Sequence, residues 1–151
     1  MDSVPRRRPV ASAHRRVLSA IEKRVPLPDI HPSWYEVLAL ASSILYLFSW
    51  TQAQRIVLVT IALLADFLDG ATARRYQRAS RAGYIVDVVT DRVSEAFIFA
   101  AAAGSTLGQV FFLLWLVNCA LAFYSVRANR HTALPLRFAW LVALVIQTTA
   151  V

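Results

Sequence analysis

Cysteine is almost absent from this chain: Cys119 is the only one among 151 residues, and it lies in an apolar run. A disulfide within the chain is therefore impossible, and a metal site made of cysteines is not expected. The first 33 residues contain arginines and prolines but no apolar core and no small-residue cleavage site. A secretory signal peptide is therefore not expected at this end.

Charge is also missing from one long stretch, since no charged residue lies between positions 96 and 126. As one straight helix these 31 residues would be about 46 Å long, whereas the hydrocarbon core of a bilayer is about 30 Å thick. The chain should therefore turn within this stretch. The segment GSTLGQ at 104–109 has the glycines and small polar residues of a turn.

The composition is that of a membrane protein. Hydrophobic residues make up 58% of the chain, and its mean hydropathy is +0.51, well above the usual apolar share of soluble domains. The formal net charge is +7, but no basic stripe is interleaved with aromatic residues, so nucleic acid is not an expected partner. The arginines gather at the ends of apolar segments instead, which is typical of membrane topology.

The predicted fold is all-α, a polytopic transmembrane bundle of about five spans preceded by an interfacial amphipathic helix. The helical spacing of apolar residues in 10–25 indicates a helix lying on an anionic membrane surface. Residues 1–33 would thus form a cytoplasmic basic tail with this helix, and 34–151 a single transmembrane catalytic domain. The spans are predicted at about 34–50, from 54 to about 76, from 83 to the turn, at about 110–126, and from 136 to 151.

The distribution of positive charge predicts the orientation of these spans. Connections rich in arginine alternate along the chain with connections that have few or none. By the positive-inside rule the N-terminus, the connection between the second and third spans, and the 127–137 loop are cytoplasmic. The expected location is therefore the cell membrane, in a multi-pass arrangement.

Four acids lie in the second and third predicted spans. Asp66 and Asp69 are spaced i, i+3, and Asp87 and Asp91 are spaced i, i+4, so each pair shares one helix face. A hairpin of the two spans would bring both pairs together near the cytoplasmic surface. Four buried carboxylates would cost on the order of 10 kcal/mol on insertion scales, and they would repel one another.

A divalent cation with oxygen ligands offsets both penalties. Mg²⁺ suits a site of a few carboxylates that is completed by water and a substrate phosphate. Two such ions can stabilise both the entering and the leaving oxygen at phosphorus, and a carboxylate outside the metal shell can accept a proton. Arginines nearby can grip phosphate. The residues therefore predict a metal-assisted phosphoryl-transfer site at the cytoplasmic edge of the bilayer.

The spacing of the acids also resembles a known signature. It reads Asp66-x2-Asp69-Gly70-x2-Ala73-Arg74-x8-Gly83-x3-Asp87-x3-Asp91. All eight fixed positions are similar to those of the CDP-alcohol phosphatidyltransferase family, and a chance match at so many positions is very improbable.

The resemblance implies a reaction in which an alcohol attacks the lipid-side phosphorus of CDP-diacylglycerol or CDP-archaeol and CMP leaves. It implies Mg²⁺ or Mn²⁺, with two ions, and a homodimer formed through membrane helices. Six spans are usual in the family, whereas five are predicted here. The implied metal ligands are Asp66, Asp69, Asp87 and Asp91, with Asp91 as catalytic base. The implied nucleotide-binding residues are Gly70, Ala73, Arg74 and Gly83.

The acceptor alcohol is less well defined by the sequence. The segment 91–99, DRVSEAFIF, resembles family members that act on inositol phosphate, and glycerol 3-phosphate is the alternative. Arg127, Arg130 and Arg137 either line a pocket for a phosphorylated alcohol or only set the topology. Arg92 and Glu95 are expected to pair with each other, and Asn118 to hydrogen-bond within the bundle.

Two functions of other classes fit part of the pattern. A small helical cation transporter would use the aspartates as an ion relay. A catalytically silent membrane scaffold would retain the acids without using them. The complete signature and the neighbouring Arg74 favour the enzyme, because a path for cations gains nothing from an arginine that grips phosphate.

Overall fold

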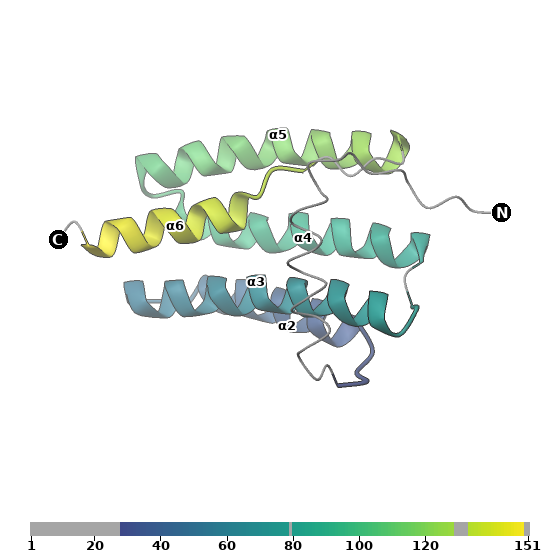
Figure 1. Ribbon diagram of the computed structural model, residues 1–151. Coiled ribbons are helices and arrows are strands. Elements are labelled where there is room, and N and C mark those ends of the chain that lie inside the picture. The colour runs from purple at the N-terminus through teal and green to yellow at the C-terminus, as the bar shows by residue number, and fades with distance from the viewer. Residues whose placement is uncertain (1–27, 79, 129–132, 150–151) are drawn as a thin grey trace.

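The computed structural model describes residues 28–78, 80–128 and 133–149, and these residues form an all-α bundle (Figure 1). The predicted interfacial helix at 10–25 and Arg130 lie outside the described residues. The helices are α2 (Ser33–Tyr46), α3 (Gln52–Arg75), α4 (Arg81–Ala102), α5 (Thr106–Ala128) and α6 (Leu136–Thr149). Their order and approximate bounds confirm the helices expected from the hydropathy pattern, but the turn predicted at 104–109 is shorter, because α5 begins at Thr106 and includes Gly108.

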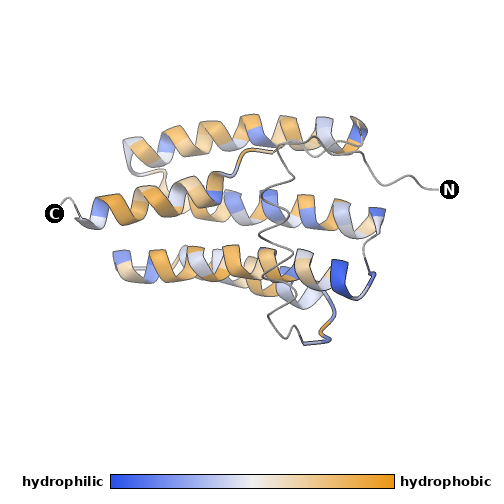
Figure 2. Cartoon of the chain, viewed as in Figure 1, coloured by the Kyte–Doolittle hydropathy of each residue, from blue (hydrophilic) through white to orange (hydrophobic). Residues whose placement is uncertain are grey.

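Two of these helices, α3 and α5, are long and apolar enough to cross a bilayer. The helix α6 is apolar but has 14 residues, and α2 also has 14 residues, so each is only about 21 Å long. Hydrophobic residues, orange in Figure 2, make up much of every helix, and many are exposed; Phe123 and Leu113 on α5 are 71% and 62% exposed. Such a surface suits lipid better than water. Five complete crossings stay a prediction.

Side-chain caps define where the longer helices begin. Thr51 accepts a hydrogen bond from the Gln54 backbone N–H, and the Gln54 side chain accepts from the Thr51 N–H, which is a capping box at the start of α3. Ser80 accepts from the Gly83 N–H at 3.0 Å and caps α4 in the same way. These caps set the register of the two helices that bear the acids.

The end of α3 is fixed by its backbone. Gln77 has φ 56°, and the N–H groups of Gln77 and Arg78 donate to the carbonyl oxygens of Arg74 and Ala73. This is a Schellman motif, which turns the chain sharply out of the helix. The four aspartates therefore lie in the last turns of one helix and the first turns of the next.

The helices do not pack in the simple hairpin order expected from the sequence. The short helix α2 packs against both α3 and α4, α5 packs against α4, and α6 packs against α3 and α5. Consecutive helices α3 and α4 are not among these closely packed pairs. The two acid-bearing helices are therefore held by α2 and α6 rather than mainly by each other, because the small residues on α2 allow it to approach both.

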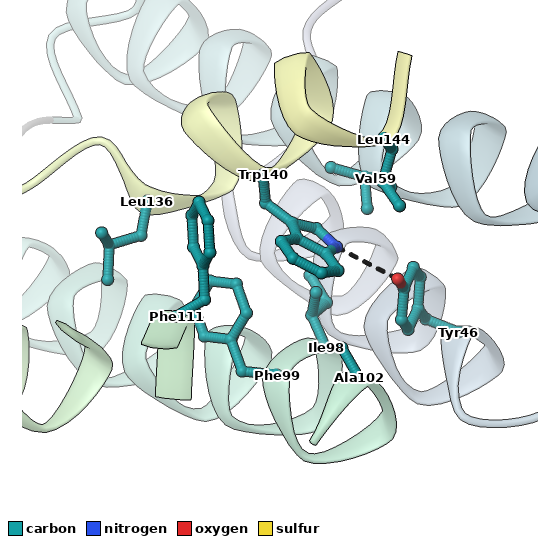
Figure 3. Close-up of a cluster of buried hydrophobic side chains, with 9 residues drawn as sticks. All are labelled: Tyr46, Val59, Ile98, Phe99, Ala102, Phe111, Leu136, Trp140 and Leu144. Atoms are coloured by element: carbon teal, nitrogen blue, oxygen red, sulfur yellow. Dashed lines mark hydrogen bonds between the residues drawn. The ribbon is translucent and has the colours of Figure 1, made fainter. Parts of the chain in front are cut away.

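The apolar core occupies the half of the bundle nearer the α4–α5 turn. Its centre is an aromatic group (Figure 3), in which Phe111 and Trp140 lie edge to face with ring centroids 4.9 Å apart and Phe99 packs on both. The Trp140 indole N–H donates to the Tyr46 hydroxyl at 3.0 Å, so even the polar atoms of this core are paired. Polar side chains gather in the opposite half.

Gly108, in the first turn of α5, packs directly on the end of α4. A Cβ added there would lie 1.8 Å from the Ala102 carbonyl oxygen, whereas one added to Gly104 would meet nothing within 4 Å. We expect Gly108→Ala to lower the free energy of unfolding by about 2–3 kcal/mol, because backbone must shift to relieve the clash. Thermal unfolding in detergent measures the effect. Gly104→Ala is the matched control and should be neutral; equal stability of the two variants would contradict this packing.

Candidate active site

The four aspartates of the signature lie at one end of the bundle. Asp66 and Asp69 are in the second half of α3, and Asp87 and Asp91 are in the first half of α4. They are electrostatically coupled to one another across the two helices, since each lies within range of the charge of at least two others. The two aspartate pairs thus lie at the same end of α3 and α4, and their assembly into one metal site stays a prediction.

Arg137, near the start of α6, is the cation at the centre of this cluster. Its Nη1 lies 2.7 Å from Asp66 Oδ2, and its Nη2 contacts Asp91 Oδ1. The arginine side chain is 6% exposed, whereas the two carboxylates are about a quarter exposed. One guanidinium thus joins α3, α4 and α6. Its burial would be strongly unfavourable without these two acids.

Asp69 is the most buried of the four, with 7% of its surface exposed. Among the described residues nothing donates a hydrogen bond to its buried Oδ1. Glu36, in the first turn of α2, also lies within electrostatic range of Asp69 and Asp91. The sequence interpretation missed Glu36, although it is the single acid in the first predicted span and that fact was available from the sequence.

The donor set has the chemistry of a site for a hard divalent cation. It consists of carboxylate oxygens on α3 and α4, and the Asp69 oxygen without a donor is available as a ligand. As arranged, however, the described residues contain no group of three or more His, Cys, Asp or Glu side chains that could hold a metal ion. The guanidinium of Arg137 uses oxygens of Asp66 and Asp91. A metal ion bound by those oxygens therefore requires Arg137 to give up its contacts.

The residues predicted to meet the nucleotide lie at the same end. Gly70 and Ala73 follow Asp69 on α3, and a Cβ added to Gly70 would lie 3.0 Å from Arg74 Nη1. The missing side chain of Gly70 therefore makes room for the Arg74 guanidinium, which folds back along the helix. Gly83 has a local structural role as well, because its N–H donates to the α4 cap Ser80.

The arginines suggested to bind the acceptor lie in different surroundings in the structure. Arg127 is exposed in the last turn of α5, and Arg137 is buried among the aspartates. Arg137 thus has two carboxylate partners that a topology-setting charge does not require, and binding of the acceptor by Arg137 stays a prediction. Nothing in the local sequence around Arg137 indicates that it pairs with acids 46 and 71 positions earlier in the chain.

A second polar layer lies beneath the cluster. Arg92 Nη1 is 2.8 Å from Glu95 Oε2, as their spacing predicted, and the Asn118 amide donates to the same oxygen at 3.3 Å. Asn118 also exchanges hydrogen bonds with the backbone of Leu134, donating to its carbonyl at 3.1 Å and accepting from its N–H at 2.9 Å. The expected role of Asn118 within the bundle is thus confirmed. Its contacts with Leu134 fix the segment that leads into α6 and so help to place Arg137.

A family model for CDP-alcohol phosphatidyltransferases matches residues 32–149 of the chain, which is most of its length. The chain belongs to this family. CDP-alcohol phosphatidyltransferases are membrane enzymes that transfer a phosphatidyl group from a CDP-lipid to an alcohol, and they generally use a divalent metal ion. No curated protein and no solved structure gives a match to the chain. The matched region contains α2 to α6, and therefore every described residue of the acidic cluster.

Proposed function

We propose that the chain transfers a phosphatidyl or archaetidyl group from a CDP-linked lipid to inositol phosphate, with release of CMP, in phospholipid biosynthesis. The observation that carries the proposal is the cluster itself. The acids of the signature gather at one end of the bundle, and the Arg74 guanidinium lies over Gly70 at that end. A site for transfer at phosphorus needs both features, a place for cations and a positive group for the phosphates of the nucleotide.

The residues that serve the proposed reaction come from both α3 and α4. The oxygens of Asp66, Asp69 and Asp87, together with Asp91, are the ligand set for two Mg²⁺ or Mn²⁺ ions. Bound there, the ions would polarise the pyrophosphate and neutralise charge that develops on the leaving CMP. Arg74 binds a phosphate of the nucleotide. Because Gly70, Ala73 and Gly83 have no side chain or a small one, the nucleotide can approach the backbone of α3 and α4 closely.

Asp91 is the proposed general base. In the structure its Oδ1 contacts Arg137, and its Oδ2 lies 3.9 Å from Arg92, so two cations face this carboxylate. A carboxylate in this position accepts the proton of the attacking hydroxyl as the new bond to phosphorus forms. The guanidinium groups near it also suit the phosphate of a phosphorylated acceptor.

The choice of acceptor is supported by the resemblance of 91–99 to members that act on inositol phosphate and by Arg137 at the cluster. Arg127 and Arg130 would add positive charge on the acceptor side. Glycerol 3-phosphate presents the same phosphate group, so the arginines do not separate the two acceptors. We further propose that the acidic end faces the cytoplasm, in line with its arginines, and that the enzyme is a homodimer.

An assay of CMP release with a panel of acceptor alcohols tests this function. Purified protein in lipid nanodiscs is given CDP-diacylglycerol or CDP-archaeol, Mg²⁺ and one alcohol at a time, and CMP release is measured. We expect release with inositol phosphate, less with glycerol 3-phosphate, and none without an alcohol or with excess chelator. Release of CMP with glycerol 3-phosphate alone would correct the acceptor. Absence of release with every alcohol, together with uptake of cations into vesicles, would support the transporter instead.

A further inference from the structure

A second polar site lies at the end of the bundle opposite the acidic cluster. Arg55, in the first turns of α3, is half-buried there, and its Nε is fully buried without a hydrogen-bond partner in the described part of the chain. Within the described residues, the aromatic ring nearest its guanidinium is that of Tyr46, with its centroid 6.0 Å away. None of the ion pairs between described residues includes Arg55.

Arg55 lies at an end of the bundle where no described acid can serve as its counter-ion. It is the one cation among the described helix ends and turns on this side of the bundle, where the α2–α3 and α4–α5 connections lie. The described acids lie toward the other end, and they are matched there by Arg74, Arg92 and Arg137. A partly buried arginine near the end of a membrane helix is unfavourable unless its guanidinium reaches an anion or water.

Arg55 borders a cavity of about 290 Å³. Ser105 and Gln147 supply polar atoms to its wall, and Trp140 and Leu144 supply an apolar floor. The Ser105 hydroxyl is already engaged with the Ala102 carbonyl and the Gly108 N–H, so the Gln147 amide and the Arg55 guanidinium are the groups left to bind a ligand. The cavity therefore offers hydrogen-bond donors and one positive charge beside an apolar surface.

The surroundings of the cavity place it at a membrane interface. Trp50, in the connection just before α3, is 90% exposed, and Phe48 beside it is 66% exposed. Exposed aromatic side chains at the end of membrane helices lie at the level of the lipid headgroups. The groups at that level with the matching charge are lipid phosphates, and their acyl chains can follow exposed apolar side chains of α3 and α6, such as Leu64 and Ile146.

We propose that this cavity binds the phosphate of an anionic phospholipid from the leaflet opposite the acidic cluster. Arg55 pairs with the phosphate, the Gln147 amide donates to it, and the acyl chains stay in the bilayer. The lipid acts as a structural ligand that supplies the counter-ion that the described protein lacks at this end. This site is separate from the transfer chemistry and does not depend on it.

The test uses the full chain in a neutral detergent. Native mass spectrometry follows retention of phosphatidylglycerol, with phosphatidylcholine as the zwitterionic comparison. We expect the wild type to retain one phosphatidylglycerol, and Arg55→Gln to bind it about tenfold more weakly, as expected for the loss of one charge-assisted contact. Arg55→Lys, which keeps the charge, should retain most of the affinity, and CMP release should be unchanged in both variants.

Arg78→Gln is the matched control, because it removes one arginine from the opposite end, where Arg78 pairs with exposed Asp29. Its retention of phosphatidylglycerol should equal that of the wild type. Equal retention by Arg55→Gln and the wild type would overturn the proposal. So would binding of inorganic phosphate with an affinity equal to that of phosphatidylglycerol, because the ligand would then be a free anion.

Discussion

Asp91→Asn is expected to slow CMP release by about 10²–10⁴-fold, the range that a positioned general base contributes. Asparagine has nearly the shape of aspartate, but it cannot take the proton of the attacking hydroxyl. The nucleotide should still bind, because its proposed contacts are with Arg74 and with ions held mainly by the other three acids. The measurements are single-turnover CMP release and, separately, equilibrium binding of a CDP-lipid.

Asp29→Asn is the matched control for this substitution. Asp29 is more than half exposed and pairs with Arg78 on the surface. Its rate should stay within about twofold of the wild type, as expected for an exposed ion pair of small energetic value. If Asp91→Asn also kept a rate within twofold, Asp91 would not be the base, and the proposed chemistry at this end of the bundle would have to change.

Arg137→Met is expected to lower the free energy of unfolding by about 3 kcal/mol, near the lower limit for breaking a buried ion pair. The lower limit applies because Asp66 and Asp91 are about a quarter exposed and water partly screens them. Methionine keeps an apolar stem of similar length, so the loss reports the guanidinium rather than packing. Thermal unfolding in detergent without divalent cations gives the comparison with the wild type.

Divalent cations should partly reverse this loss. Because Arg137 uses carboxylate oxygens that the proposed metal ions also need, the variant should gain more stability from Mg²⁺ than the wild type does. Arg127→Met is the control, since Arg127 is exposed at the end of α5. Its loss should change neither the free energy of unfolding nor the stability gained from Mg²⁺. An Arg137 variant that is as stable as the wild type, or that Mg²⁺ does not stabilise further, would contradict the bridging role given to this arginine.

Much of the fold followed from local patterns. The charge-free stretch was too long for one span, and the structure turns at Gly104 and Ser105. The spacing of Arg92 and Glu95 predicted their pairing, since residues three apart on a helix are neighbours. The two aspartate pairs were placed on their helices for the same reason. These features depend on residues close together in sequence, and helix geometry relates such residues directly.

The contacts between helices did not follow from the sequence. Arg137 reaches Asp66 and Asp91 only because α6 packs against α3 with a particular rotation and height, which no local pattern specifies. The same holds for Asn118, whose partner Leu134 lies beyond the end of α5. The packing of α2 against both α3 and α4 was also not predicted. The sequence of this 14-residue helix, with small side chains at Ala39, Ser42 and Ser43, looks like that of any short membrane span. Tertiary packing decides all three.

The central claim is that acids from α3 and α4 together hold divalent ions against the phosphates of a nucleotide. Electron–nuclear double resonance on protein loaded with Mn²⁺ and CDP-diacylglycerol tests it most directly. We expect bound Mn²⁺ with coupling to ³¹P, and loss of that signal when Asp66 and Asp87, one from each helix, are both changed to asparagine. Mn²⁺ that shows no ³¹P coupling in the wild type, or that binds the double variant equally well, would contradict the account.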